Sequence, residues 1–177
     1  MQGERSMPLD FPVPGMRHVC LTTLVLDYNG TIADRGRLIP GVAERLRRLA
    51  SKLNIHVFTA DTFGSVRAEL GREFLSEMHS GRISVDIILP QELRPGRSEA
   101  DAKLDMLAPL GPKHCCAMGN GRNDVPMLGS AGLSFCIIGR EGCSPKAMNA
   151  AHIVCRDILD ALDMLLEPAC CTATLRT

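Results

Sequence analysis

Residues 24–31 of the chain, LVLDYNGT, place an acidic side chain directly after an apolar stretch. A carboxylate such as Asp27 can attack a phosphoryl group and form an aspartyl-phosphate, which divides the transfer into two easier steps. Gly30 would let the backbone approach the phosphate, and Thr31 offers a hydroxyl group. Such chemistry also leads us to expect a second carboxylate at residue 29, where Asn29 stands. Taken alone, the stretch is equally typical of a turn, because Asn-Gly is a turn signal.

Three further parts of the chain carry groups that this chemistry needs. A carboxylate nucleophile and a phosphate are both anions, so the site requires Mg²⁺ together with positive or hydrogen-bonding groups. Thr59 offers a second hydroxyl, Lys103 a positive charge, and Asp124, at the end of the Gly-rich run GNGRND, a second carboxylate for the metal. Each of these has an ordinary structural explanation. The complete set in this order nevertheless favours a phosphoryl-transfer site.

The surrounding sequence alternates short apolar runs with amphipathic stretches, which is typical of a parallel sheet covered by helices. We expect strands at 21–27, 55–61, 83–89, 114–118, 133–139 and 152–155. We expect helices over 40–53 and 62–75, after a Ser98–Asp101 capping box, after Ser144–Pro145, and over 157–167, where Pro168 would end the last one. The pattern predicts one doubly wound, Rossmann-like α/β domain over residues 1–177, with an N-terminal extension at 1–19 and a C-terminal tail at 168–177.

This fold class would bring the reactive residues together. In doubly wound folds, ligands bind at the carboxyl ends of the strands. Asp27, Thr59 and Gly119 each fall at the end of a different predicted strand. We therefore expect three separate motifs to meet at one edge of the sheet.

The composition argues against several other classes of protein. Net charge is zero, only 3% of the residues are aromatic and Trp is absent, so a nucleic-acid partner is not expected. No apolar run reaches the roughly 18 residues that span a bilayer, and the N-terminus does not resemble a signal peptide, so we expect a cytoplasmic protein without a membrane partner. The eight cysteines include no C-x-x-C pair. We interpret Cys115, Cys116, Cys136 and Cys155 as buried free thiols, and the pair Cys170–Cys171 stays open.

The combined motifs resemble the haloacid dehalogenase (HAD) superfamily. The chain has D-x-x-G-T after a first strand, Thr at the end of the second, Lys before the fourth and G-N-G-x-N-D after it. Within that superfamily the sequence is most similar to the phosphorylation domain of P-type ATPases, which carries D-K-T-G-T and G-D-G-x-N-D. The similarity covers about residues 20 to 166. The chain as a whole resembles a soluble P-type-ATPase-like HAD protein.

The resemblance implies roles for individual residues. Asp27 would be the phosphorylated nucleophile and a Mg²⁺ ligand, and Asn123 would support it or a metal-bound water. The implied metal ligands are Asp27, the backbone carbonyl of Asn29, Asn120 and Asp124. The implied catalytic residues are Asp27, Asn29, Thr59, Lys103 and Asn123. The implied substrate-binding residues are Gly30, Thr31, Thr59, Ala60 and Lys103.

Two positions depart from the family pattern. HAD phosphatases have Asp where Asn29 stands, and an amide cannot supply the acid–base help that is worth about 10²–10⁴-fold. Asn29 therefore predicts slow hydrolysis or a long-lived phosphoenzyme. Asn120 replaces a second family Asp, which predicts weaker metal binding unless a nearby acid compensates. Asp61 is the available candidate, although capping of the following helix explains it more simply.

The connections between motifs are short for a HAD enzyme. Twenty-seven residues separate Thr31 from Thr59, and 43 separate Thr59 from Lys103, so neither has room for a large cap. We expect an open site, or one that a neighbouring subunit of a homo-oligomer covers. The leading hypothesis is a Mg²⁺-dependent phosphohydrolase acting on a small phosphorylated substrate. The alternatives are an impaired HAD domain that binds phosphorylated ligands or partners without useful turnover and, last, a receiver-like phospho-acceptor switch.

Overall fold

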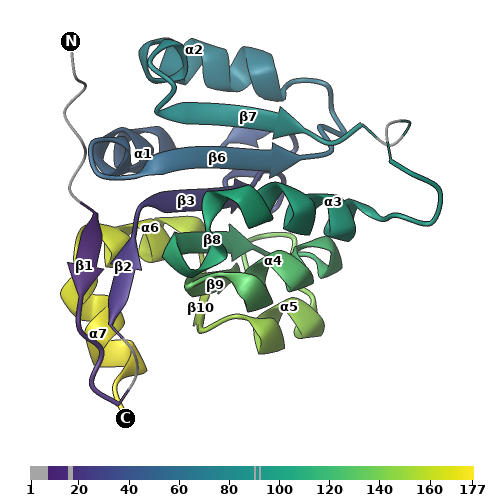
Figure 1. Cartoon of the computed structure of the whole chain (residues 1–177). Helices are drawn as coiled ribbons and strands as arrows, with labels where there is room; N and C mark the ends of the chain where they lie inside the picture. Colours follow the sequence, from purple (N-terminus) through teal and green to yellow (C-terminus); the bar gives the residue numbers. More distant parts are fainter. Residues whose placement is uncertain (1–7, 16–17, 90, 92) are drawn as a thin grey trace.

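The computed structural model describes residues 8–15, 18–89, 91 and 93–177. Its centre is a six-stranded, wholly parallel sheet in the order β10-β9-β8-β3-β6-β7 (Figure 1). The strands are β3 (Thr23–Asp27), β6 (Asn54–Thr59), β7 (Ile83–Ile87), β8 (Cys115–Gly119), β9 (Leu133–Ile137) and β10 (Ile153–Cys155). All six correspond to strands expected from the sequence. The predicted doubly wound α/β class without a large cap is confirmed.

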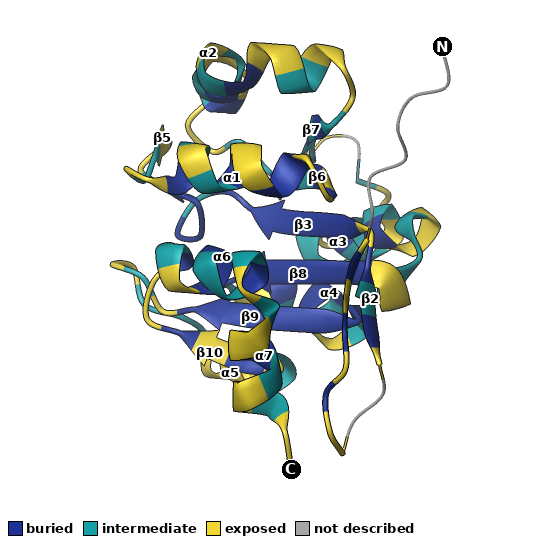
Figure 2. Ribbon diagram, turned by 90° about the vertical axis from the view of Figure 1, so that its left-hand side faces the viewer, coloured by how far each residue is buried: buried dark blue, intermediate teal, exposed yellow. Residues whose placement is uncertain are grey.

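Helices cover both faces of the sheet and give three layers. One face carries α1 (Val42–Ala50), α2 (Val66–His79) and α6 (Ile158–Leu166). The other carries α3 (Glu99–Leu107), α4 (Val125–Ser130) and α5 (Pro145–Ala150). Because successive side chains of a strand point to opposite faces, Leu24 and Leu26 of β3 join the first core and Val25 joins the second. Figure 2 shows β3, β8 and β9 as the most buried strands.

Local sequence explains where the helices begin. Val42, Leu46 and Leu49 form the buried stripe of α1, at the spacing of one helix face. The expected capping box at α3 is confirmed, since the Ser98 side chain accepts a hydrogen bond from Asp101 N and the Asp101 carboxylate accepts one from Ser98 N. The Asp157 side chain caps α6 by accepting hydrogen bonds from Leu159 N and Asp160 N.

Regular secondary structure occurs in both the expected N-terminal extension and the expected C-terminal tail. The predicted strand 21–27 is divided: β2 (Val19–Leu21) pairs antiparallel with β1 (Leu9–Phe11), and β3 starts after Thr22. Pro168 was expected to end the last helix, but it opens another, α7 (Pro168–Leu175), because proline is tolerated in the first turn. α7 packs against β1, and buried Cys171 joins the first core. No described helix is long and apolar enough to cross a bilayer.

Candidate active site

The ends of three neighbouring strands meet beside Asp27, the last residue of β3. The parallel register places Asp27 beside Phe58 of β6, one residue before Thr59. On the other side, Leu26 lies beside Met118 of β8, one residue before Gly119. The sheet therefore brings the expected motifs to a common edge, as parallel strands require.

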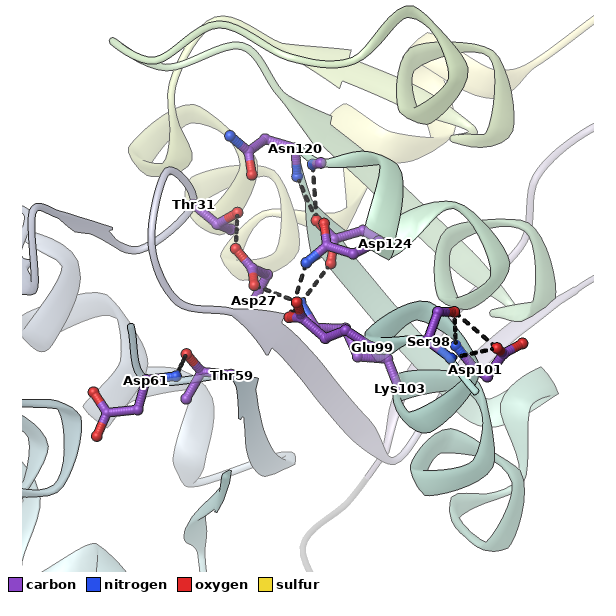
Figure 3. A network of polar contacts seen from close by, with 12 residues as sticks. Asp27, Thr31, Thr59, Asp61, Ser98, Glu99, Asp101, Lys103, Asn120 and Asp124 are labelled. Atoms are coloured by element: carbon purple, nitrogen blue, oxygen red, sulfur yellow. Dashed lines mark hydrogen bonds and ion pairs between the residues drawn. The ribbon is translucent and has the colours of Figure 1, made fainter. Parts of the chain in front are cut away.

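A buried ion cluster occupies this edge (Figure 3). The ammonium group of Lys103 lies 2.6 Å from Asp27 Oδ1 and 2.7 Å from Asp124 Oδ1. The side chains of Lys103 and Asp124 are fully buried, and that of Asp27 is 9% exposed. Lys103 thus bridges the two carboxylates from α3, although the sequence also allowed a solvent-facing residue there.

Hydrogen bonds fix both carboxylates of the cluster. Thr31 Oγ1 donates to Asp27 Oδ2 at 3.1 Å, so Thr31 and Lys103 hold the two carboxylate oxygens of Asp27. Asp124 Oδ2 accepts from the backbone N–H groups of Asn120 and Gly121 at 3.0 and 2.9 Å. The backbone of the Gly-rich loop after β8 therefore hydrogen-bonds to Asp124, the acid at the end of the same loop. None of the described buried side-chain oxygen and nitrogen atoms lacks a hydrogen-bond partner.

The cluster changes the proton affinities of its members. Burial, and secondly the charge of Asp124, raise the pKa of Asp27 from 3.8 to about 7, against the opposing effects of Lys103 and Thr31. Burial alone would lower the pKa of Lys103, but the two carboxylates outweigh it and raise that pKa above its ordinary value. Lys103 therefore stays charged, while Asp27 ionises near neutral pH.

Glu99 belongs to the site, although the sequence did not point to it. Its Oε1 accepts a hydrogen bond from Asn123 Nδ2 at 2.9 Å and lies 3.6 Å from Lys103 Nζ. Glu99 is the first residue of α3, four residues before Lys103, so in sequence it resembles an ordinary surface pair along a helix. Asn123, expected to support the nucleophile or a metal-bound water, donates to Glu99 in this structure.

Asn29 is turned toward a hairpin that the sequence did not predict. The hairpin consists of β4 (Ala33–Asp34) and β5 (Arg37–Leu38) with Gly36 at its turn, at φ 79°. Asn29 Oδ1 accepts a hydrogen bond from Gly36 N at 3.0 Å. The hydroxyl of buried Tyr28 donates to Gly36 O at 3.0 Å, and burial raises the pKa of that phenol. The side chain at residue 29 therefore anchors the hairpin.

The acid that was considered as compensation for Asn120 has another role. Asp61 Oδ1 accepts from the N–H groups of Ser65 and Val66 at 3.0 and 3.1 Å, which caps the start of α2. Gly30 lies between Asn120 and another acid, Glu141, because a Cβ added at Gly30 would meet the side chains of both. Gly30 also has φ 78°, so both its space and its conformation require glycine.

The side chains of the remaining predicted residues make no recorded hydrogen bond to Asp27, Lys103 or Asp124. Thr59 is 3% exposed, and its Oγ1 accepts from Asp61 N at 3.0 Å. Ala60 follows it and is half-buried. The Asn120 side chain donates to Gly142 O at 3.2 Å, which ties the loop after β8 to the loop after β9. Cys115, Cys116, Cys136 and Cys155 are buried free thiols, as expected.

The donor set fits a divalent cation. Among the described residues, no three Cys, His, Asp or Glu side chains are arranged to hold a metal by themselves. Mg²⁺, however, commonly takes one or two carboxylates and completes its shell with water and substrate phosphate. Asp27, Asp124 and Glu99 bring three carboxylates against the single ammonium of Lys103. When all are ionised, two negative charges remain, which one dication would balance.

Comparison with known sequences gives two relatives, both described as uncharacterized proteins of Methanocaldococcus jannaschii. One is 43% identical over 83 residues, which is 45% of this chain and 89% of that protein. The chain belongs to the same family as this archaeal protein. The other is 46% identical over 39 residues, 22% of this chain and 89% of that protein. No family model matches the chain.

Solved structures with a similar backbone include phosphatases and a haloacid dehalogenase-like hydrolase. A cobalt-bound deoxy-D-mannose-octulosonate 8-phosphate phosphatase from Haemophilus influenzae has a TM-score of 0.62 at 13% identity, covering 89% of this chain and 94% of that one. The corresponding Moraxella catarrhalis phosphatase, in complex with magnesium, phosphate and a KDO molecule, has a TM-score of 0.57 at 12% identity. That match covers 83% of this chain and 86% of the phosphatase. A haloacid dehalogenase-like hydrolase from Streptococcus pneumoniae has a TM-score of 0.51 at 17% identity, and the match covers 72% of this chain and 59% of that hydrolase. At these identities the likeness shows a shared fold.

Proposed function

We propose that the chain is a Mg²⁺-dependent phosphohydrolase that acts on small phosphate compounds through an aspartyl-phosphate on Asp27. The observation that carries the proposal is the buried cluster, in which Lys103 bridges Asp27 and Asp124 at the carboxyl edge of the sheet. A structural ion pair in this position would not need a second carboxylate. The excess of acid suits a site that receives a cation and a phosphate together. The phosphatases with the same fold support the same reaction class.

The chain's own residues account for the first step. The ionised carboxylate of Asp27 forms a bond to phosphorus while the bond from phosphorus to the leaving oxygen breaks. Lys103 balances negative charge beside the nucleophile, and Thr31 holds the second oxygen of Asp27 in place. The bound dication would be held by Asp27 and Asp124, with Asn120 and the carbonyl of Asn29 as further ligands, and would supply charge neutralisation at the phosphate oxygens.

The second step lacks a protein acid–base group at residue 29. Water attacks the phosphorus of the aspartyl-phosphate, releases inorganic phosphate and regenerates Asp27. Asn29 cannot take up a proton, and its side chain is engaged with Gly36. We therefore propose slow hydrolysis and a persistent phosphoenzyme, the behaviour implied by the resemblance to P-type ATPases.

One assay tests this function. The purified chain is incubated with Mg²⁺ and a panel of phosphate compounds, beside Asp27→Asn and a control variant, Asp163→Asn, which changes a carboxylate paired with Arg45 on the surface. We expect phosphate release and an acid-stable phosphoenzyme in the unchanged chain and in Asp163→Asn, and neither in Asp27→Asn. Equal phosphate release and equal phosphoenzyme levels in the unchanged chain and in Asp27→Asn would refute the proposed enzymatic function.

A second candidate function is a domain that binds phosphorylated ligands without useful turnover. It is favoured by the two amides, Asn29 and Asn120, that stand where the family has acids, and by the engagement of Asn29 with the hairpin. Binding of phosphate compounds without release of phosphate, and without a phosphoenzyme, would favour this candidate. Light scattering tests the further expectation that a homo-oligomer covers the open site.

A further inference from the structure

A cavity of about 760 Å³ opens beside the turn that follows Asp27. Gly30 and Thr31 form the wall on the side of the ion cluster. The residues that follow β9 and β10 form the opposite wall, and the β4–β5 hairpin with the segment after it forms a third. Thr31 lines the cavity and its hydroxyl also donates to Asp27, so the cavity lies next to the carboxylate that would receive the phosphate. The cavity is therefore placed to receive the part of a substrate that leaves.

The lining of the cavity is aliphatic. Ile39, Ile137, Ile158 and Leu159 contribute to it, and the described residues that line it include no aromatic ring. Flat bases bind proteins mainly by stacking on aromatic side chains. The lining therefore suits a saturated carbon chain and gives no platform for a nucleotide.

Arginines lie along the same cavity. Arg140 and Arg156 follow adjacent strands, and the backbone bond from Gly139 N to Arg156 O, 2.8 Å long, fixes their relative position. Arg37 reaches the cavity from the hairpin. Because these positions come from the sheet register and from the hairpin, the cationic part of the cavity is set by the fold.

Two of the acids around the cavity have local partners. Asp157 caps α6 through two backbone N–H groups, and Asp34 lies 3.9 Å from a guanidinium nitrogen of Arg140. Glu141, an exposed residue of the same lining, places its Oε2 beside Gly30. Within the described part of the chain, no hydrogen bond or ion pair engages the guanidinium of Arg37 or Arg156. These two arginines are available to an anion.

We propose that this cavity binds the alcohol portion of an aliphatic phosphate monoester that carries a carboxylate at its far end, held by Arg156 and Arg37. The assignment rests on the proposed function, because Asp27 receives the phosphate. A guanidinium pairs with a carboxylate through two parallel hydrogen bonds, which gives both affinity and orientation. The substrate class is therefore phosphorylated hydroxy acids of the aliphatic series.

Calorimetric titration of the Asp27→Asn chain, in which no phosphoenzyme forms, measures the cavity separately from turnover. The probes are alkyl monophosphates of increasing length and a matched series in which a carboxylate replaces the terminal methyl group. At the length that spans the cavity we expect about tenfold tighter binding of the carboxylated probe. Adding Arg156→Gln should remove this preference and leave binding of the methyl probe unchanged, whereas Arg48→Gln, on the exposed side of α1, should preserve it.

The outcomes separate this assignment from the proposed function. Equal binding of both series at every length, binding of neither, or a preference that survives Arg156→Gln combined with Arg37→Gln would overturn the assignment. A carboxylate preference that depends on Arg156 supports it, even if the unchanged chain hydrolyses none of the probes. In that case only the hydrolase proposal fails. Hydrolysis of both series at equal efficiency leaves the hydrolase standing and rejects the carboxylate subsite.

Discussion

The chain contains two close acid–base contacts of nearly equal length in very different surroundings. Lys103 lies 2.6 and 2.7 Å from Asp27 and Asp124 at the end of the sheet, where the lysine is fully buried. Arg45 of α1 makes two hydrogen bonds of 2.7 Å to Asp163 of α6, where the acid is 47% exposed. Distance alone would rank the two contacts as equals. Their burial and their balance of charge separate them.

We interpret the difference as a division of roles, in which the surface contact supports stability and the buried cluster supports the proposed chemistry. The surface pair contains one acid and one base, so its charges cancel. It connects two packed helices, α1 and α6, as expected of a contact that contributes to stability. The buried cluster has an excess of acid, and burial of charge costs free energy unless every charge is paired. A cluster that opposes folding in this way is expected where a cation and an anionic substrate complete it.

Replacement of the buried lysine should show the largest difference between the two regions. In Lys103→Met, Asp27 and Asp124 would face each other without a cation, and we expect a loss of about 3–5 kcal/mol in the free energy of unfolding at neutral pH. Arg45→Met is the matched change in the surface pair and should have a much smaller effect, because water solvates the freed Asp163. Denaturant titration measures both. Equal losses would mean that the cluster is solvated and that the contrast is wrong.

The pH dependence of stability should distinguish the buried Asp27 from a surface acid. Because the folded chain raises the pKa of Asp27 from 3.8 to about 7, it binds a proton that the unfolded chain has released between those values. The contribution of Asp27 to stability therefore falls as pH rises from about 4 to 7. Asp27→Asn removes this loss, so in the absence of divalent cations its melting temperature should exceed that of the unchanged chain by more at pH 8 than at pH 5.

A measurable size follows for that shift. In a chain of this length about 1 kcal/mol moves the melting temperature by roughly 2–4 °C, so we expect a gain of a few degrees at pH 8. Asp163→Asn serves as the control and should gain nothing, since its arginine partner lowers the pKa of Asp163. A gain that is independent of pH would indicate a packing effect at residue 27 and not relief of a buried charge.

Glu99 tests whether the excess charge of the cluster serves a cation. In Glu99→Gln the amide oxygen can still accept from Asn123, so the change removes one charge 3.6 Å from Lys103 Nζ and little else. We expect Mn²⁺ binding, measured by electron paramagnetic resonance, to weaken about fivefold, which corresponds to roughly 1 kcal/mol for one partly solvated charge. Glu44→Gln, on exposed α1, should bind Mn²⁺ unchanged. An unaltered affinity in Glu99→Gln would place the cation beyond the influence of Glu99.

The same two regions show what the sequence could and could not predict. The ends of β3, β6 and β8 were predictable, because apolar runs followed by Asp27, Thr59 and Gly119 specify both the strands and their common edge. The burial of Lys103 was not predictable from helix periodicity. It depends on how α3 packs against α4 and the turn at Arg122–Asp124 after β8, which is a tertiary property.

The missed features share a physical cause. Glu99 in sequence resembles a surface partner of Lys103, and only the packing of α3 against the loop after β8 turns it toward Asn123. The hairpin that holds Asn29 has strands of two residues each, too short for a periodic signal, and it depends on the positive φ of Gly36. α7 was missed because Pro168 can open a helix as well as end one.

Asn29→Asp should produce the smallest change. An acid at this position in a responsive site would speed release of inorganic phosphate by about 10²–10⁴-fold. Here the side chain accepts from Gly36 N, and Tyr28 and Ser65 hold the carbonyl of the same residue. A carboxylate would accept from that N–H more strongly than the amide does and would stay at the hairpin, so we expect an increase of less than about tenfold.

Single-turnover measurement of phosphate release from the phosphoenzyme compares Asn29→Asp with Asn149→Asp, the same substitution on exposed α5, which should leave the rate unchanged. A hundredfold increase would show that the new carboxylate leaves Gly36 and reaches the phosphate. The buried cluster and the surface pair of Arg45 and Asp163 would then also differ in mobility. The contact between residue 29 and Gly36, beside the cluster, would break during turnover. An increase below tenfold would instead assign the slow second step to the hairpin as well as to the missing acid, since the hairpin holds whichever side chain occupies residue 29.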